Sequence, residues 1–235
     1  MQKLKFNPSA IRINFPFRSE ISAYKDEIFN MLLGIICSFS TVFGGYIPFC
    51  ISFYASGTLC KASVFKFLAI AVSAVLSVGA KMSIKYIVPI LIYTALNIVF
   101  PIKRTSAKAA VSASLLFLTG LAASYMDSFL LYDVVLCATE SFIAFVGVFI
   151  MDKAVPIVKE YTKRSIVSQD EFVCLTAFFA VCVFAASRIP PLFGVKICNI
   201  LCILLILIFD KTGEMGMGAS IGVVCGVASG MNNFN

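Results

Sequence analysis

Long uncharged, apolar runs make up most of this sequence, and the charged residues lie mainly between them. The runs comprise residues 28–60, 67–80, 86–102, 109–126, 134–139, 141–151, 172–187, 197–209 and 215–235. A transmembrane helix needs about 20 mostly apolar residues, and lysines at its ends can extend toward the polar interface. Most of these runs therefore predict one membrane-spanning helix each.

The first run is too long for a single crossing, and it contains a signal for a helix break. Gly44, Gly45 and Pro48 stand close together, and the residue before a proline is pushed out of helical geometry. We therefore predict a break at these three residues and two crossings, near 28–44 and 46–60.

These patterns predict an all-α fold, a polytopic integral membrane helix bundle with about nine transmembrane helices (eight to ten). The expected crossings lie near 28–44, 46–60, 64–80, 86–102, 109–126, 133–151, 172–187, 194–209 and 215–232. Residues 1–27 are polar and predict a cytoplasmic arm, whereas residues 152–171 predict a basic amphipathic segment on the same side. Within that segment Ser168 and Glu171 have the spacing of a capping box, which predicts a helix start.

The basic residues give the bundle an orientation. When loops are assigned alternately to two sides, 15 of the 19 Lys and Arg residues fall on the side of the N-terminus and four on the other. Cytoplasmic loops carry the excess of basic residues, so we expect a multi-pass membrane protein with a cytoplasmic N-terminus. An odd number of crossings would place Asn235 on the far side of the membrane, away from the cytoplasm.

Composition supports a membrane protein and excludes several kinds of site. Hydrophobic residues make up 60% of the chain and charged residues 13%, whereas soluble domains are roughly 25% charged. The chain has no His, which excludes Ser-His-Asp triads, Cys-His dyads and His-bearing zinc sites. Its nine Cys form no Cys-x-x-Cys pair, and no Gly-x-x-x-x-Gly-Lys-Ser/Thr loop occurs. We expect no catalytic residue, no metal, no cofactor and no nucleic-acid partner.

Glycine recurs at every fourth position in the last run, at Gly218, Gly222, Gly226 and Gly230. Residues four apart share a helix face, so these glycines predict a flat strip that another helix can approach closely. Helix contact within the chain is one interpretation, and self-association is the other.

Glu140 is the candidate for an ionisable group inside the membrane, because it lies within the run between Asp133 and Asp152. A charged group at that depth is costly and is by default a functional candidate. A protonated, hydrogen-bonded structural role is the alternative to a proton or ion role. Lys81 and Lys85, by contrast, are expected to extend to the membrane interface.

Four basic residues of the segment 152–171, Lys153, Lys159, Lys163 and Arg164, alternate with apolar side chains. Such a segment on the cytoplasmic leaflet attracts anionic lipid. We interpret it as a membrane-surface helix, and a docking site for a cytosolic partner is the alternative.

The chain resembles the N-terminal membrane region of the stage II sporulation protein E family over most of residues 28–235. Four features occur in the family's order: the turn at 45–49, Glu140 in a middle crossing, the helix start at 168–171 and the glycine-rich stretch 216–226. The resemblance implies about ten crossings ahead of a C-terminal PP2C-type serine/threonine phosphatase. It also implies action at the polar septum in forespore sigma-factor activation, and association with the division protein FtsZ and other septal proteins.

From this resemblance we expect an anchoring, localisation and assembly module in the bacterial cell membrane that has no catalytic activity of its own. Its partners would be the lipid bilayer, further copies of itself and septal proteins. The alternative is an independent small-solute or ion transporter or channel subunit. A membrane-embedded enzyme is a third hypothesis, but no pair of acids falls on one helix face.

Overall fold

The computed structural model describes residues 16–42, 45–57, 63–127, 130–160, 168–189, 196–212 and 217–231. Helices α1 to α9 occupy most of these residues, and within them the only strand-like pairing is an isolated bridge between Val42 and Tyr46. Their bounds are α1 Pro16–Phe39, α2 Pro48–Ser56, α3 Ser63–Val78, α4 Ala80–Val99, α5 Thr105–Asp127, α6 Leu131–Glu160, α7 Gln169–Ala186, α8 Ile197–Thr212 and α9 Met217–Met231. The all-α prediction is confirmed.

Two helices extend beyond the apolar runs that predicted them. Helix α1 begins at Pro16, inside the expected polar arm, and proline is well suited to the first turn of a helix. Helix α6 is 30 residues long and continues to Glu160, so its last turns form the first part of the expected surface segment. Ala154 and Ile157 are buried in this extension. An apolar run marks where a helix meets lipid or core, and a helix can continue past it.

Gly79 alone connects α3 to α4, with a φ of 85° that side-chain-bearing residues seldom adopt. The connection is so short that Lys81 and Lys85 belong to the first turns of α4. They do not lie in a loop between the crossings expected at 64–80 and 86–102.

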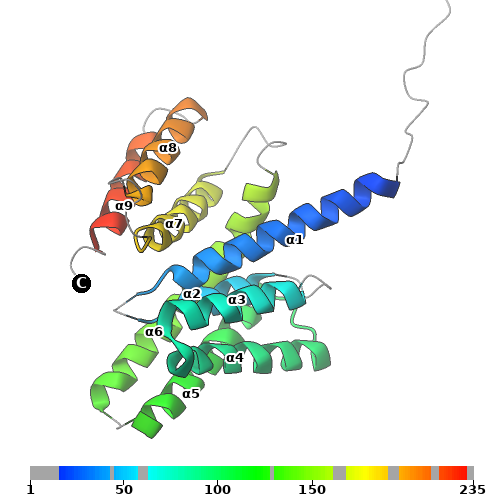
Figure 1. Ribbon diagram of the computed structural model, residues 1–235, viewed down its shortest axis with the longest axis vertical. Coiled ribbons are helices and arrows are strands. Elements are labelled where there is room, and N and C mark those ends of the chain that lie inside the picture. The colour runs from blue at the N-terminus through cyan, green and yellow to red at the C-terminus, as the bar shows by residue number, and fades with distance from the viewer. Residues whose placement is uncertain are drawn as a thin grey trace, which may run out of the picture.

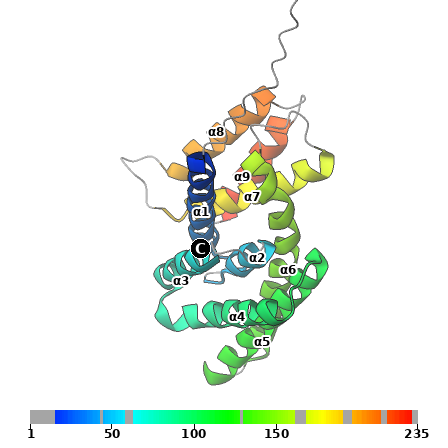
Figure 2. The same ribbon diagram turned by 90° about the vertical axis from the view of Figure 1, so that its right-hand side faces the viewer.

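The helices form two groups that α6 connects. Figures 1 and 2 both place α7, α8 and α9 at one end of the molecule and α4 and α5 at the other, with α1 and α2 between them. One apolar core lies among α1 to α6 and part of α7, and a second lies among α7, α8, α9 and the end of α6.

Helix α2 lies at the centre of the first group, in contact with α1, α3, α4, α5 and α6. It has nine residues, and all of them except Phe49 are buried. At 1.5 Å per residue the helix is about 14 Å long, less than half of the hydrocarbon core of a membrane. Within the crossing expected at 46–60, the structure therefore describes a helix that is enclosed by protein and too short to span the hydrocarbon core by itself.

Among the described residues, four helices are long and apolar enough to cross a membrane: α4, α5, α6 and α7. Shorter apolar helices of the described chain lie at Val64–Val78, Ile197–Asp210 and Gly218–Gly230. Large apolar side chains such as Leu76, Ile98 and Val223 are exposed on the outside of these helices, as expected for contact with lipid. The nine predicted transmembrane helices are not confirmed by these lengths.

Candidate functional site at the break before α2

The described residues between α1 and α2, 40–42 and 45–47, are not helical, although Ser40, Thr41 and Ile47 are buried. Val42 and Tyr46 exchange backbone hydrogen bonds of 2.6 and 2.9 Å across the turn that contains Gly45. The Ile47 amide, at the N-cap of α2, donates to the Tyr86 hydroxyl at 3.2 Å. Non-helical backbone at membrane depth is tolerated only where protein or water satisfies its polar groups. Pro48 is the first residue of α2, whereas Gly44 lies outside the described residues.

Glu140 lies beside this break, on α6, with 1% of its surface exposed. Its Oε2 accepts a hydrogen bond from the Lys85 ammonium of α4 at 2.5 Å, and its Oε1 accepts one from the Tyr86 hydroxyl at 2.7 Å. Lys85 is therefore a buried partner of Glu140 and does not extend to the interface as expected. Because the Tyr86 hydroxyl also accepts from Ile47, one continuous chain of hydrogen bonds joins the break to the carboxylate.

Two further groups contact the Lys85 ammonium. The Tyr46 ring lies 4.4 Å from Nζ, in the geometry of a cation–π contact, and the Cys137 Sγ lies at 4.0 Å. Gly120 of α5 makes room for the lysine stem, because a Cβ there would lie 3.1 Å from the Lys85 Cε and 2.9 Å from the Cys137 Sγ. Four segments of the chain thus enclose the ion pair.

A pair of this kind is energetically asymmetric. Burying two charges together costs desolvation free energy that their attraction roughly offsets, but removing one partner leaves an uncompensated charge in the core. The carboxylate also lies near the N-terminus of α2, where the helix dipole favours negative charge. The ion pair therefore favours one position of α2 relative to α4 and α6. The two charges of the pair cancel each other.

The other end of α2 is closed by a second lysine. Lys66 of α3 is buried and donates to the carbonyls of Phe53 and Tyr54 at 2.6 and 3.4 Å. Its ammonium also lies 4.0 Å from the centre of the Phe53 ring. A cation at a helix C-terminus satisfies unpaired carbonyls and complements the dipole. Helix α2 therefore has a carboxylate near its first turn and an ammonium at its last.

One face of α2 packs closely against α6. The Ser52 hydroxyl donates to the Pro48 carbonyl within α2 and to the Ala144 carbonyl of α6, each at 2.9 Å. A Cβ on Gly147 would lie only 2.7 Å from the Ser52 Oγ. The glycine thus permits the approach that the hydroxyl needs.

The structure divides the predicted glycine strip of α9 into two parts. A Cβ on Gly218 would meet the Ile206 carbonyl at 3.3 Å, and one on Gly222 would meet the Ile206 side chain at the same distance, so both face α8. A Cβ on Gly226 or Gly230 would find no described atom within 4 Å. Contact within the chain therefore accounts for the first two glycines, and the last two remain available for another helix.

The basic residues of the predicted surface segment 152–171 also differ in their surroundings. Lys153 is exposed on α6, and Lys159 forms an ion pair with Asp26 of α1 at 3.6 Å and lies 5.5 Å from the Phe29 ring. Lys163 and Arg164 lie outside the described residues. Asp26 and Lys159 therefore tie the end of α6 to α1.

Metal-binding side chains do not gather anywhere in the described chain in a group of three or more. Eight cysteines of that part of the chain are free thiols, and most of them are buried among apolar residues. The site at the break is thus built from carboxylate, ammonium, phenol and backbone groups alone.

Comparison with known proteins identifies the family. The family model described as SpoIIE, N-terminal domain matches residues 2–235. The chain belongs to this family. The resemblance noted in the sequence is thereby confirmed, and the apolar helices together with the SpoIIE family indicate a membrane protein. No curated protein and no solved structure matches the chain.

Several residues of the site were not recognised in the sequence, among them Lys85, Tyr86, Gly120 and Gly147. Lys85 had a usable signal, because a lysine and a glutamate that each lie within an apolar region tend to pair with each other. The two glycines had no such signal, since their importance comes from Cys137 and Ser52, which lie on other helices.

Proposed function

We propose that this SpoIIE N-terminal domain anchors and positions a sporulation phosphatase in the membrane, at the polar septum where the forespore sigma factor is activated. The match to the SpoIIE N-terminal family over residues 2–235 is the observation that carries the proposal. The four long apolar helices support the anchoring part. The domain itself supplies position and assembly, and it performs no chemical step.

A multi-pass arrangement with the N-terminus in the cytoplasm is part of this proposal. Its support is the 15-to-4 distribution of basic residues between alternate loops. Seven basic residues of the described chain belong to the loops on the side of the N-terminus: Lys25, Lys66, Lys103, Arg104, Lys108, Lys153 and Lys159. We assign that side to the cytoplasm.

The geometry suits an anchor because its interior is fixed and its outside is apolar. The Lys85 and Glu140 pair and the Lys66 cap hold α2 in place, so the first group of helices can act as a rigid body. Exposed apolar faces contact lipid, and Gly226 and Gly230 offer a slim face for self-association. FtsZ and other septal proteins are the proposed partners on the cytoplasmic side.

A transporter or channel subunit is the second candidate, favoured by the buried charges next to a broken helix. Discontinuous helices and intramembrane charges are common at transport sites. Two observations favour the anchor instead. The Lys85 and Glu140 charges satisfy each other at 2.5 Å, and the open cavity next to the break, about 300 Å³ in volume, is lined by apolar residues of α6, α7 and α9 together with Val42 and Phe49.

Fluorescence microscopy of sporulating cells tests the proposal. The full chain, fused at its N-terminus to a fluorescent protein, is expressed in an endospore-forming bacterium beside a general membrane dye. We expect the ratio of fusion to dye to rise at the polar septum relative to the lateral membrane. A uniform ratio would contradict septal placement, and soluble fluorescence would contradict anchoring. The dye corrects for the two bilayers of the septum.

A further inference from the structure

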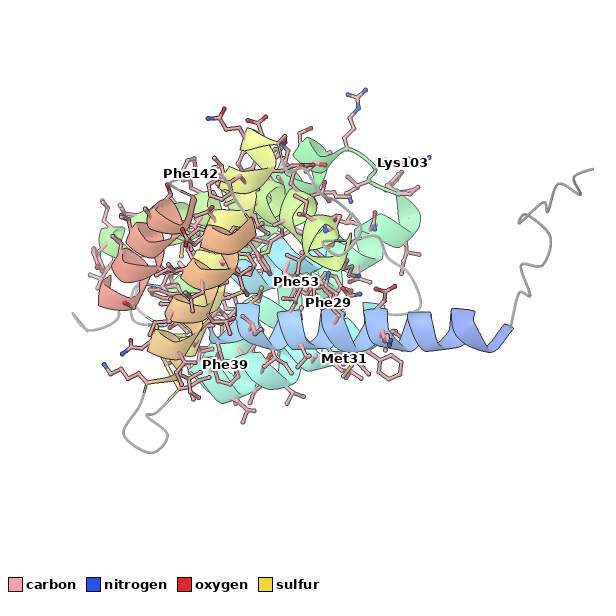
Figure 3. The ribbon with its side chains drawn as sticks, turned by 90° about the horizontal axis from the view of Figure 1, so that it is seen from above. Phe29, Met31, Phe39, Phe53, Lys103 and Phe142 are labelled. Carbon is pink, nitrogen blue, oxygen red and sulfur yellow. The ribbon has the colours of Figure 1, made fainter. Side chains whose placement is uncertain are left out.

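The last turn of α1 ends among other helices, and its backbone oxygens are buried. Cys37 and Ser38 in this turn are 1% and 0% exposed. Helix α1 contacts α2, α3 and α7, and in Figure 3 the labelled Phe39 lies at the enclosed end of α1, whereas the other end extends away from the remaining helices. The last carbonyls of a helix have no partner within it. Because those of α1 are shielded from solvent, they need a partner from elsewhere.

The helical hydrogen bonds of α1 stop short of the carbonyls of Cys37 and Ser38. Continuation of the helix would bring the amides of Thr41 and Val42 to these two carbonyls. The Thr41 amide instead bonds to the Phe39 carbonyl at 3.0 Å, and the Val42 amide bonds to a carbonyl across the turn at 2.6 Å. Within the described chain, the Cys37 and Ser38 carbonyls therefore receive no helical amide.

A buried hydroxyl next to these carbonyls also has no partner. Ser40 is 0% exposed, and its Oγ makes no hydrogen bond in the part of the chain that the structure describes. Thr41, which is 3% exposed, carries a second hydroxyl beside it. The segment 37–41 is little longer than one helical turn, so its oxygens lie close together. Because buried polar groups are almost always paired, this group of oxygens indicates a bound ligand.

A comparison of the ends of α1 and α2 shows the charge of the ligand. At the end of α2, the Lys66 ammonium donates to two backbone carbonyls. The last turn of α1 has no basic residue, although the C-terminal end of a helix carries a partial negative charge. Lys85 and Glu140 beside the break pair with each other. A cation would therefore complete the end of α1 as the Lys66 ammonium completes the end of α2.

The kinds of oxygen in the segment 37–41 favour a monovalent cation. The segment contains carbonyls and hydroxyls but no carboxylate, whereas Ca²⁺ and Mg²⁺ sites use carboxylates. In membrane proteins, carbonyls at the C-terminal end of a broken helix bind Na⁺, and rings of carbonyls bind K⁺. Val42, Gly45 and Tyr46 of the adjoining turn are partly exposed. An ion can therefore reach the buried oxygens through this turn.

We propose that the end of α1 binds a monovalent alkali cation. Its ligands are two carbonyls and two hydroxyls, those of Cys37, Ser38, Ser40 and Thr41. The ion satisfies oxygens that the broken helix leaves unpaired, and it thereby stabilises the break. No metal was expected from the sequence, because backbone ligands leave no residue signature. The proposal requires only the fold around the break, so it can fail without affecting septal placement.

Thermal unfolding of the purified full chain in mild detergent tests this site. The midpoint is measured in NaCl, KCl and choline chloride at equal ionic strength, because choline is too large for a site of this kind. With Na⁺ or K⁺ above its dissociation constant, we expect the midpoint to rise by roughly 3–5 °C for each tenfold increase in concentration. The salt with the larger effect identifies the ion. Equal midpoints in all three salts would overturn the proposal and would leave water as the partner of these oxygens.

Ser40→Ala removes one ligand and should raise the cation concentration needed for the same increase in midpoint about tenfold. Ser112→Ala is the matched control, because Ser112 is also 0% exposed but its hydroxyl donates to the Ala109 carbonyl of α5 at 3.1 Å. Helix α5 does not contact α1, so this variant should keep the full response to the cation. An unchanged response in Ser40→Ala, or an equal weakening in both variants, would overturn the proposal.

Discussion

The two groups of helices differ in what holds them together. Lys66 and Tyr93 donate hydrogen bonds to carbonyls of α2, and the Ile47 amide at its N-cap donates to the Tyr86 hydroxyl. The Ser52 hydroxyl adds a bond to α6, and apolar contacts complete the packing of α2. The core of α7, α8 and α9 consists of aliphatic side chains, thiols and rings, with Phe209 between Phe172 and Phe179 at centroid distances of 6.1 and 5.6 Å. There, Thr176 and Ser229 donate to carbonyls of their own helices.

This difference has a physical consequence in a membrane. Lipid chains are as apolar as leucine, so apolar contacts between helices gain little beyond van der Waals attraction, and many alternative contacts are nearly equivalent. A charged pair has one favourable arrangement, because displacement leaves a charge unpaired. We therefore expect the first group of helices to have a single packing arrangement and to tolerate few substitutions. The second group should be able to adopt several packing arrangements.

Loss of one charge of the Lys85 and Glu140 pair should lower the free energy of unfolding more than the other substitutions below. Glu140→Gln leaves the Lys85 ammonium unpaired, and we expect the free energy of unfolding in detergent to fall by about 3–5 kcal/mol. The measurement is helix content by circular dichroism during titration with a denaturing detergent. Leu205→Met in the second group is the control and should cost less than about 1.5 kcal/mol. Equal losses in the two variants would remove the contrast between the groups.

Adding one methyl group should separate the two kinds of glycine. Gly147→Ala places a Cβ against the Ser52 Oγ, and we expect a loss of about 1–3 kcal/mol in the same titration. Gly226→Ala introduces a Cβ with no described neighbour within 4 Å, and it should change the free energy of unfolding by less than about 0.5 kcal/mol. A larger loss at Gly226 than at Gly147 would reverse this assignment.

Loss of the helix cap at the start of α7 should reduce stability mainly at that helix end. The Ser168 hydroxyl accepts from the Glu171 amide, and the Glu171 side chain accepts from the Ser168 amide. Ser168→Ala removes the first of these bonds and should cost about 1 kcal/mol. Hydrogen exchange should quicken at residues 169–172 and stay unchanged in α2. An unchanged rate at the start of α7 would show that the cap contributes nothing.

The smallest effect is expected in the aromatic contacts of the second group. Phe209→Leu keeps an apolar side chain and loses only the edge-to-face contacts with Phe172 and Phe179, worth about 0.5–1 kcal/mol. Thermal unfolding in detergent measures the change. A loss as large as that of Glu140→Gln would mean that the second group is as specific as the first.

The sequence predicted the features that depend on local pattern. Uncharged runs located the helices, and the turn near Pro48 located the break. The capping box at Ser168 and Glu171 is confirmed, since its hydrogen bonds form between residues three apart. The membrane placement of individual crossings stays a prediction.

Features that depend on two distant segments could not be predicted. Lys85 and Glu140 are 55 positions apart, and Ser52 and Ala144 are 92 apart. Interface placement was a reasonable expectation for Lys85 because the single residue Gly79 was not recognised as a complete connection between helices. An uncharged run shows neither how long a helix is nor how deeply it is enclosed, so the buried nine-residue helix α2 could not be predicted from it.

A double-mutant cycle on Lys85 and Glu140 tests most directly whether the buried pair holds the first group of helices in place. The variants are Lys85→Met, Glu140→Gln and their combination, compared with the unsubstituted chain by unfolding in detergent. We predict that the double variant is more stable than the sum of the single losses implies, by about 2 kcal/mol or more, because no unpaired charge remains. Losses that add to within about 0.5 kcal/mol would contradict a coupled pair.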